Sequence, residues 1–178
     1  MQEIKIIIGL GNPGKEYEKT YHNAGRIFVE YWNEHQKEIA SQSLAMTGGE
    51  TEKGGNRGVE ALATDGFMNQ SGDSVRKILK ERGLRIEDAL IVHDDSDIYM
   101  GDYKISRDRG AAGHKGVEHI MAVFGTKDFT RLRIGIRPKQ KTGTERKKAD
   151  EFVLKKITAA NMKVLEKVFE EATSRLSS

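Results

Sequence analysis

Apolar runs typical of strands alternate along this chain with segments in which apolar residues recur at helical spacing. Short apolar or alternating runs predict strands over residues 4–9, 59–64, 89–93, 102–106 and 132–136. Apolar residues three or four positions apart predict helices over residues 23–38, 71–83 and 113–124, the second ending at Gly83. Thr158 is placed to cap a last helix that ends near Arg175. The alternation predicts an α/β domain with a twisted, mixed, largely parallel central sheet flanked by helices.

A chain of 178 residues has the length of one domain. Residues 1–178 show neither an internal repeat nor a linker, which also favours a single domain. Charged residues make up 32% of the chain and no run of 18 apolar residues occurs, so we expect no membrane span. The N-terminus lacks the basic and apolar regions of a secretion signal, and the absence of cysteine excludes disulfides, zinc thiolates and cysteine nucleophiles. A cytoplasmic location is the simplest expectation. Two polar segments predict a glycine-rich hairpin or loop (47–58) and a basic loop (139–148).

Basic residues are concentrated in the second half of the chain. Residues 1–98 contain 12 Lys/Arg and 17 Asp/Glu, whereas residues 99–178 contain 18 and 10. Arg131, Arg133 and Arg137 alternate along or beside a predicted strand, so their side chains should point to one face. A basic cluster is commonly only a solvated face, but this one also fits a polyanionic partner.

The segment GLGNPGKEYEKTYHNAG (residues 9–25) follows the first predicted strand and fits two incompatible functions. Gly9, Gly11 and Gly14 match the G-x-G-x-x-G pattern of dinucleotide-binding turns. That pattern is weak by itself, Pro13 removes a backbone N–H from the turn, and no acidic residue ends a second strand where a ribose contact is expected. A nucleotide-dependent oxidoreductase is therefore disfavoured.

The same segment contains His22, which suits a hydrolase because imidazole accepts a proton from water near neutral pH. Such a base needs a partner that stabilises its charged form. One source is the polar run VHDDSD (92–97) at the end of a predicted strand, where open α/β sheets place their sites. Two further polar segments, FMNQSG (67–72) and GAAGHKG (110–116), each lead into a predicted helix.

Together these segments resemble the bacterial peptidyl-tRNA hydrolase family. The matching pieces are GLGNPG, Tyr17, Thr20 with HNAG, FMNQSG, HDDSD, GHKG, and GTKDF followed by RLRIGI. Each piece alone is weak, but they occur in the family's order and spacing over most of residues 4–154, and the ordered set is highly specific. The resemblance implies a monomeric, cofactor-free esterase that cleaves peptidyl-tRNA and so recycles tRNA during translation.

The resemblance also implies roles for individual residues. His22 would activate water as the general base, and Asp94 would hydrogen-bond it and stabilise its charged form. Asn12 would contact the peptidyl part and distinguish N-blocked substrates, whereas Asn69 would bind near the ester and donate to the developing oxyanion. Other residues would contact the substrate and its tRNA: Tyr17, Phe67, Asn69, Lys115, Lys104, Arg107 and Arg133. His114 and Asn23 would support the catalytic residues.

Each of these residues also has an ordinary structural interpretation. His22 is suited to cap the helix that starts near Asn23, and Asn12 and Asn69 are ordinary turn and cap residues. Tyr17 and Phe67 are suited to plain packing. The three acids beside His93 are suited to a divalent-metal site or a solvated loop. The resemblance favours an acid that orients a histidine, so we expect no metal ion.

Three departures from the family pattern bear on activity. Lys115 stands where the family usually has Asn in a G-H-N-G run, and lysine donates hydrogen bonds but cannot accept one from the attacking water. Asp108, Arg109 and Ala112 replace glycines in the preceding loop, which predicts a stiffer loop. After residue 154 there is room for little more than one helix, so we expect a shortened C-terminal helical region and a more open cleft.

Two functions remain open on these grounds. One is an active hydrolase, and the other is a family-like RNA-binding protein that has lost hydrolysis through Lys115 and the shortened end. The intact set of His22, Asp94, Asn12 and Asn69 favours the enzyme.

Overall fold

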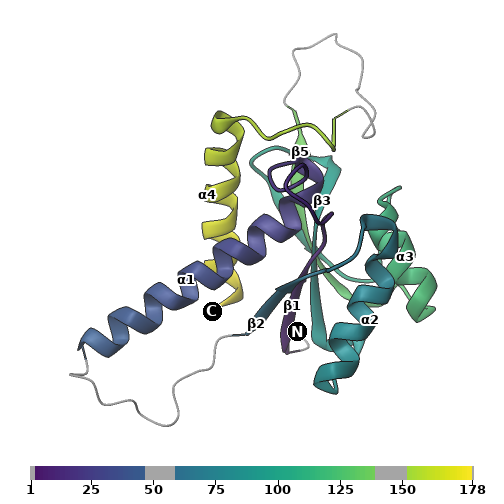
Figure 1. Ribbon diagram of the computed structural model, residues 1–178, viewed down its shortest axis with the longest axis horizontal. Coiled ribbons are helices and arrows are strands. Elements are labelled where there is room, and N and C mark those ends of the chain that lie inside the picture. Colours follow the sequence, from purple (N-terminus) through teal and green to yellow (C-terminus); the bar gives the residue numbers. More distant parts are fainter. Residues whose placement is uncertain (1–2, 47–58, 139–151, 178) are drawn as a thin grey trace.

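A five-stranded sheet with helices on both faces forms the molecule (Figure 1). The computed structural model describes residues 3–46, 59–138 and 152–177, so the predicted loops at 47–58 and 139–148 lie outside the described residues. The strands are β1 (Ile6–Gly9), β2 (Glu60–Ala63), β3 (Ala89–Tyr99), β4 (Tyr103–Ser106) and β5 (Thr130–Arg137). The longer helices are α1 (Ala24–Met46), α2 (Ser71–Arg82), α3 (Lys115–Phe124) and α4 (Ala159–Leu176). Short 3-10 turns are η1 (Tyr21–Asn23), η2 (Met68–Gln70) and η3 (Ile86–Asp88).

The sheet has the order β2-β1-β3-β5-β4. Strand β4 runs antiparallel to β5, and the other neighbours are parallel, so the predicted mixed, largely parallel sheet is confirmed. Helices α1 and α4 cover one face, and α2 and α3 cover the other (Figure 1). None of the described helices is both long and apolar enough to cross a membrane.

Alternation along the strands builds one hydrophobic core on each face of the sheet. In β1, Ile7 packs into the core with α1 and α4, whereas Ile6 and Ile8 pack into the core with α2 and α3. The large residues that α1 and α4 contribute to their core are Phe28, Trp32, Leu165 and Phe169. Each face is therefore closed by two helices, and the polar chemistry is left to the ends of the strands.

Two helix ends are as the sequence predicts. Gly83 follows α2 in the left-handed conformation, with φ of 63°, and Thr158 accepts a hydrogen bond from the Asn161 N–H at the start of α4. Helix α1 is longer than predicted, because it runs to Met46 rather than to residue 38. Its apolar periodicity fades there, but residues 39–46 contain no glycine or proline and are rich in good helix formers.

Strand β3 is also longer than predicted, continuing to Tyr99 instead of ending at residue 93. Strand β5 pairs with the extension, with Asp94 opposite Ile134 and Asp95 opposite Gly135. A Cβ atom on Gly135 would lie 2.1 Å from the carbonyl oxygen of Tyr99, so only glycine allows this close approach. The two acids therefore lie within a strand, and their side chains point in opposite directions.

Candidate active site

Two glycines bring the start of α1 close to the ends of β1 and β3. A Cβ atom on Gly9 would lie 2.2 Å from the Gly25 carbonyl oxygen, and one on Gly25 would lie 2.3 Å from that of Val92. The 3-10 turn that carries His22 directly precedes this contact. The glycines of the opening motif therefore serve close packing, and this packing sets His22 beside the C-terminal half of β3.

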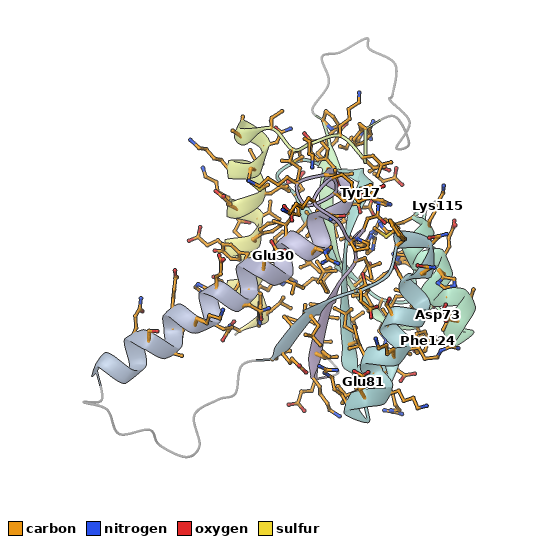
Figure 2. All side chains as sticks on the ribbon, viewed as in Figure 1. Tyr17, Glu30, Asp73, Glu81, Lys115 and Phe124 are labelled. Atoms are coloured by element: carbon orange, nitrogen blue, oxygen red, sulfur yellow. The ribbon has the colours of Figure 1, made fainter. Side chains whose placement is uncertain are left out.

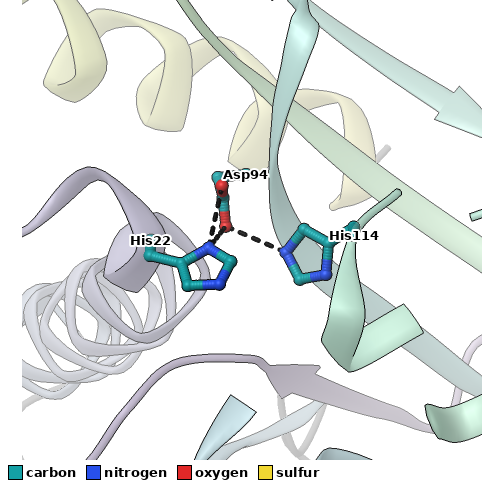
Figure 3. Close-up of side chains that lie close together, drawn as sticks. All are labelled: His22, Asp94 and His114. Carbon is teal, nitrogen blue, oxygen red and sulfur yellow. Dashed lines mark hydrogen bonds and ion pairs between the residues drawn. The ribbon is translucent and has the colours of Figure 1, made fainter. Parts of the chain in front are cut away.

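His22 and Asp94 form a hydrogen-bonded pair. The Nδ1 atom of His22 lies 2.9 Å and 3.1 Å from the two carboxylate oxygens of Asp94. A carboxylate can only accept, so Nδ1 carries the proton and the lone pair of the neutral ring lies on Nε2. Figure 3 shows this second nitrogen on the side of the ring away from Asp94. The His22 ring is thus held by Asp94, with Nε2 as its acceptor nitrogen.

His114 is a second histidine on the same carboxylate. Its Nε2 atom lies 3.0 Å from Oδ1 of Asp94, and its Nδ1 atom accepts the backbone N–H of Val117 at the start of α3. The bond from Val117 requires a lone pair on Nδ1, so the proton is on Nε2 and is donated to Asp94. The carboxylate bridges the two imidazole rings from one side, and the ring centroids are 4.9 Å apart (Figure 3).

Asp94 is held in its ionised form. Its side chain is only 3% exposed, and burial acts to raise the pKa of the carboxyl, but His22 and His114 together lower that pKa well below its usual range. A permanently charged carboxylate favours a proton on a neighbouring imidazole. This is the electrostatic arrangement that a general base needs when it takes a proton from water.

His93 supports the pair from inside the protein, although sequence reasoning gave it no role except beside a metal. Its Nδ1 atom lies 2.7 Å from the backbone oxygen of Asp94, and its ring packs edge-on against His114 with a centroid separation of 4.7 Å. Burial and the nearby His114 lower the pKa of His93 well below its usual range. His93 is therefore a neutral packing partner that fixes the position of the His114 ring.

Asn12 is held by two segments far apart in the sequence. The Asn23 side chain accepts the backbone N–H of Asn12 at 2.8 Å and donates to its carbonyl oxygen at 2.9 Å. The side-chain oxygen of Asn12 accepts the backbone N–H of Met68 at 2.8 Å. Because that oxygen is occupied, the amino group of Asn12 is the part that can donate to a ligand. Asn23 thus supports the turn that carries Asn12.

A cavity of about 460 Å³ lies next to these residues. Asn69, in the η2 turn directly before α2, is exposed and lines it together with Met68. The exposed Phe67 also lines it and meets the Tyr17 ring edge-on, with centroids 6.2 Å apart. Asn12, His22, Asp94, Asp95, Ser96, Ala111, Ala112, Gly113, His114, Lys115, Val153 and Leu154 complete the lining. The structure thus brings together the four predicted catalytic residues from four separate segments.

The segment before α4 forms part of the site that sequence reasoning missed. The backbone N–H of His22 donates to the Val153 carbonyl at 2.8 Å, and the N–H of Ile157 donates to the Lys19 carbonyl at 2.7 Å. These bonds hold the His22 turn against the segment before α4, while Val153 and Leu154 supply an apolar wall to the cavity. Backbone pairing of this kind has no residue-type pattern that could have revealed it.

The predicted tRNA-binding cations lie in two places. Lys115 lines the cavity at the start of α3, and Figure 2 shows it toward the same end of the sheet as Tyr17. Lys104 and Arg133 are direct partners across β4 and β5, and Arg107 follows on the loop after β4. Arg133 donates from Nε to Asp95 at 2.8 Å, and Arg107 pairs with Asp128. The second group therefore flanks the cavity on the sheet edge without being part of its described lining.

His22, Asp94 and His114 are also the described residues that could together hold a metal ion, since their ligand atoms lie within 4.8 Å of one another. A metal would need a lone pair on the nitrogen that each histidine turns toward Asp94. The Val117 N–H, however, occupies the lone pair of His114 on the other nitrogen. The hydrogen-bond pattern therefore fits a proton-carrying histidine pair better than a metal centre.

Three kinds of comparison with known proteins agree on one family. Residues 6–178 match the family model described as peptidyl-tRNA hydrolase. A peptidyl-tRNA hydrolase of Aquifex aeolicus is 34% identical over 171 residues, covering 96% of this chain and 86% of the relative. One of Mycoplasma capricolum is 36% identical over 166 residues, covering 93% and 87%. The solved structure of the Acinetobacter baumannii enzyme superposes with a TM-score of 0.74 at 30% identity, covering 99% of this chain and 88% of that one.

Proposed function

The chain belongs to the peptidyl-tRNA hydrolase family, and we propose that it hydrolyses the ester between a peptide and tRNA with His22 as the general base. The observation that carries this proposal is the His22–Asp94 pair on the wall of a cavity that also contains Asn12 and Asn69. The substrate class follows from the family, and the roles below follow from the geometry of these side chains.

The reaction needs one water molecule and no redox step. Nε2 of His22 takes a proton from water as its oxygen attacks the ester carbonyl, and Asp94 stabilises the imidazolium that forms. Asn69 donates from its amide to the tetrahedral oxyanion. The intermediate then expels the ribose oxygen, which takes the proton from His22. The products are a peptide with a free carboxylate and a tRNA with a free terminal hydroxyl.

Asn12 supplies the preference for blocked amino groups. Its oxygen is occupied by the Met68 N–H, so its amino group is directed to an acceptor. In a peptidyl or N-acetyl substrate, the preceding carbonyl oxygen is such an acceptor. A free aminoacyl-tRNA presents an ammonium group instead, which is a donor, so the contact is lost and the two donors oppose each other.

Lys104 and Arg133 form the contact with a tRNA phosphate. They lie directly opposite each other on antiparallel strands, where two like charges are unfavourable unless an anion joins them. Asp95 already holds the Arg133 guanidinium through Nε, which leaves the terminal nitrogens to meet a phosphate. Arg107, on the loop after β4, extends this basic surface, and Lys115 adds a cation to the cavity lining. Tyr17 and Phe67 provide aromatic contacts for the terminal nucleotides.

The scheme needs neither a cofactor nor a metal ion, and all its residues come from one copy of the chain, which agrees with a monomer. Because peptidyl-tRNA is released by ribosomes, the enzyme would act in the cytoplasm. Lys115 cannot accept a hydrogen bond from the attacking water, but it can donate to the oxyanion or to a phosphate, so we expect altered rather than absent activity.

The proposal is tested with N-acetyl-aminoacyl-tRNA and free aminoacyl-tRNA as parallel substrates. We expect fast release from the first and little from the second, with release abolished by His22→Ala. His35→Ala is a matched control, because His35 stacks on Tyr31 in α1 away from the cavity lining. Tight tRNA binding without release by the unmodified protein would refute hydrolysis and indicate the RNA-binding alternative.

A further inference from the structure

We propose that Arg131 is a positioning residue that holds the loop of residues 108–113 and thereby sets His114 against Asp94. The proposal rests on the hydrolase function above for its kinetic consequences, but not for its structural ones. Arg131 lies on β5 two residues before Arg133, and nothing in the motif pattern distinguishes the two.

Arg131 is among the most deeply buried side chains of the molecule, although it carries a charge. It is 1% exposed, and one terminal nitrogen, Nη2, donates to the backbone oxygens of Arg109 at 2.8 Å and Gly110 at 3.1 Å. Its guanidinium lies 5.8 Å from the centre of the Phe129 ring. Burial and the neighbouring Arg133 lower its pKa, yet an arginine remains protonated in a protein.

The partners of Arg131 are unusual for a buried cation. Within residues 3–46, 59–138 and 152–177, no carboxylate forms an ion pair with it, and its buried Nε has no hydrogen-bond partner. Burying a charge is unfavourable unless it is paired, and an apolar side chain would fill the same space without that penalty. The two loop carbonyls are therefore the contacts that the guanidinium specifically provides.

The loop that Arg131 holds has a backbone that would not persist by itself. Asp108 and Ala112 have φ of 52° and 51°, in the left-handed region that disfavours residues with a Cβ atom. Such conformations persist only where the surrounding structure imposes them. The carbonyls bound by Arg131 lie between these two residues. Hydrogen bonds at this point can hold both residues in the left-handed conformation.

The clamped loop leads directly into the active site. The N–H of His114 donates to the Ala111 carbonyl at 3.0 Å, which closes the turn, and His114 then reaches Asp94. Ala111, Ala112 and Gly113 line the cavity next to it. A shift of the loop therefore moves both the cavity wall and the histidine that shares the carboxylate of the base.

Arg133 is a matched comparison on the same strand. Both arginines alternate with the apolar residues Leu132 and Ile134, which face α1 and α4, so both point to the other side. Arg133 is partly exposed and paired with Asp95, whereas Arg131 is covered by the loop. The first is placed to bind substrate, and the second to position protein groups.

Steady-state kinetics with N-acetyl-aminoacyl-tRNA distinguish the role of Arg131 from that of Arg133. For Arg131→Met we expect kcat to fall by about 10- to 100-fold, the effect of a displaced catalytic group, with KM within about twofold and an unchanged salt dependence of KM. For Arg133→Met we expect the reverse, a higher KM with a shallower salt dependence, because one phosphate contact is lost. A normal kcat per folded molecule, or a KM effect like that of Arg133→Met, would overturn the proposal.

A measurement that needs no activity tests the clamp itself. Trypsin cleaves after Arg109, whose carbonyl is one of the two that Arg131 binds. Under conditions where far-UV circular dichroism shows a folded protein, cleavage of the Arg109–Gly110 bond should be at least about tenfold faster in Arg131→Met than in Arg133→Met. Equal cleavage rates would refute the clamp even if the hydrolase function were also absent.

Arg131→Lys is the variant to measure if Arg131→Met does not fold. Lysine keeps the charge and most of the stem, but its ammonium is one bond shorter and cannot reach both carbonyls. We expect a kcat between those of the wild type and Arg131→Met, with faster cleavage at Arg109 than in the wild type. Wild-type kinetics and wild-type cleavage in Arg131→Lys would contradict the proposal.

Discussion

Replacing Asp94 by asparagine removes the charge beside His22 and leaves the volume of the side chain almost unchanged. In the wild-type protein, the carboxylate meets Nδ1 of His22 at 2.9 Å and 3.1 Å and also accepts a bond from His114. The amide of the variant can accept one of these bonds but can also donate to Nδ1, which would move the His22 proton to Nε2. The variant therefore loses both the charge and the control of the tautomer.

The size of the effect follows from the charge separation. When His22 becomes an imidazolium, its charge lies about 4 Å from that of the carboxylate, and at an effective dielectric constant of about 20 the attraction is about 4 kcal/mol. Since about 1.4 kcal/mol corresponds to a tenfold change in rate, Asp94→Asn should lower kcat by about 10³-fold. KM should change little, because the pair acts on the developing charge rather than on the bound substrate.

The pH profile gives a second, independent readout. We expect activity to fall at low pH once the proposed base is protonated, while Asp94 stays ionised because its pKa is lowered. Removing the negative charge disfavours the imidazolium, so the acid limb of the Asp94→Asn profile should move to lower pH. Asp97→Asn makes the same charge change on an exposed residue of the same strand and should shift neither kcat nor the limb. A loss below tenfold in Asp94→Asn, or a limb that moves to higher pH, would refute this account of the base.

Three further predictions concern the departure from the family pattern, the glycine packing and the surface charges. Lys115→Asn removes a cation beside the cavity, so the acid limb of kcat should move to higher pH; an unchanged turnover and profile would show that the position has no such role. Gly25→Ala should destabilise the fold by about 1–3 kcal/mol in urea titrations and lower kcat, because its Cβ would lie 2.3 Å from the Val92 carbonyl oxygen. Lys77 and Ser74 lower the pKa of Asp65 to about 2, so the contribution of this ionised carboxylate to stability is present above about pH 4 and is lost as the pH falls toward 2. Because the side chain is 61% exposed, Asp65→Asn should lower the free energy of unfolding by less than about 1 kcal/mol at pH 7. The difference between the variant and the wild type should shrink in acid.

The sequence predicted the elements well wherever the apolar period was strong. It failed at two ends for different reasons. Helix α1 continues past residue 38 because residues 39–46 include the good helix formers Ala, Gln, Leu and Met, and a search for apolar spacing does not register helix propensity. Strand β3 continues through its acids because β5 is long enough to pair with them and Gly135 lets the chains approach. Pairing of that kind depends on a strand 40 residues away and has no local pattern.

The residues proposed as catalytic could be picked out from the sequence by their side-chain chemistry, whereas the residues that hold them could not. His22 and Asp94 belong to polar segments beside apolar strands, and such segments are visible in a sequence. The His22 turn, however, is held by a backbone bond to Val153, for which almost any residue would serve. The role of His93 depends on the contact of its ring with His114. That contact forms through the packing of α3 against the sheet, which the sequence around His93 does not indicate.

Arg131 and Arg133 show why alternation along a strand has limited power to predict function. The pattern RLRIGIR correctly places both on one face, and their chemistry is identical. The difference between them arises from the loop of residues 108–113, which covers one arginine and leaves the other partly exposed. A strand pattern reports direction, but whether a charge binds substrate or supports the protein depends on what the rest of the chain lays over it. Under the roles proposed for them, Arg131 would act on turnover and Arg133 on affinity, and the kinetics of their two methionine variants would measure this difference.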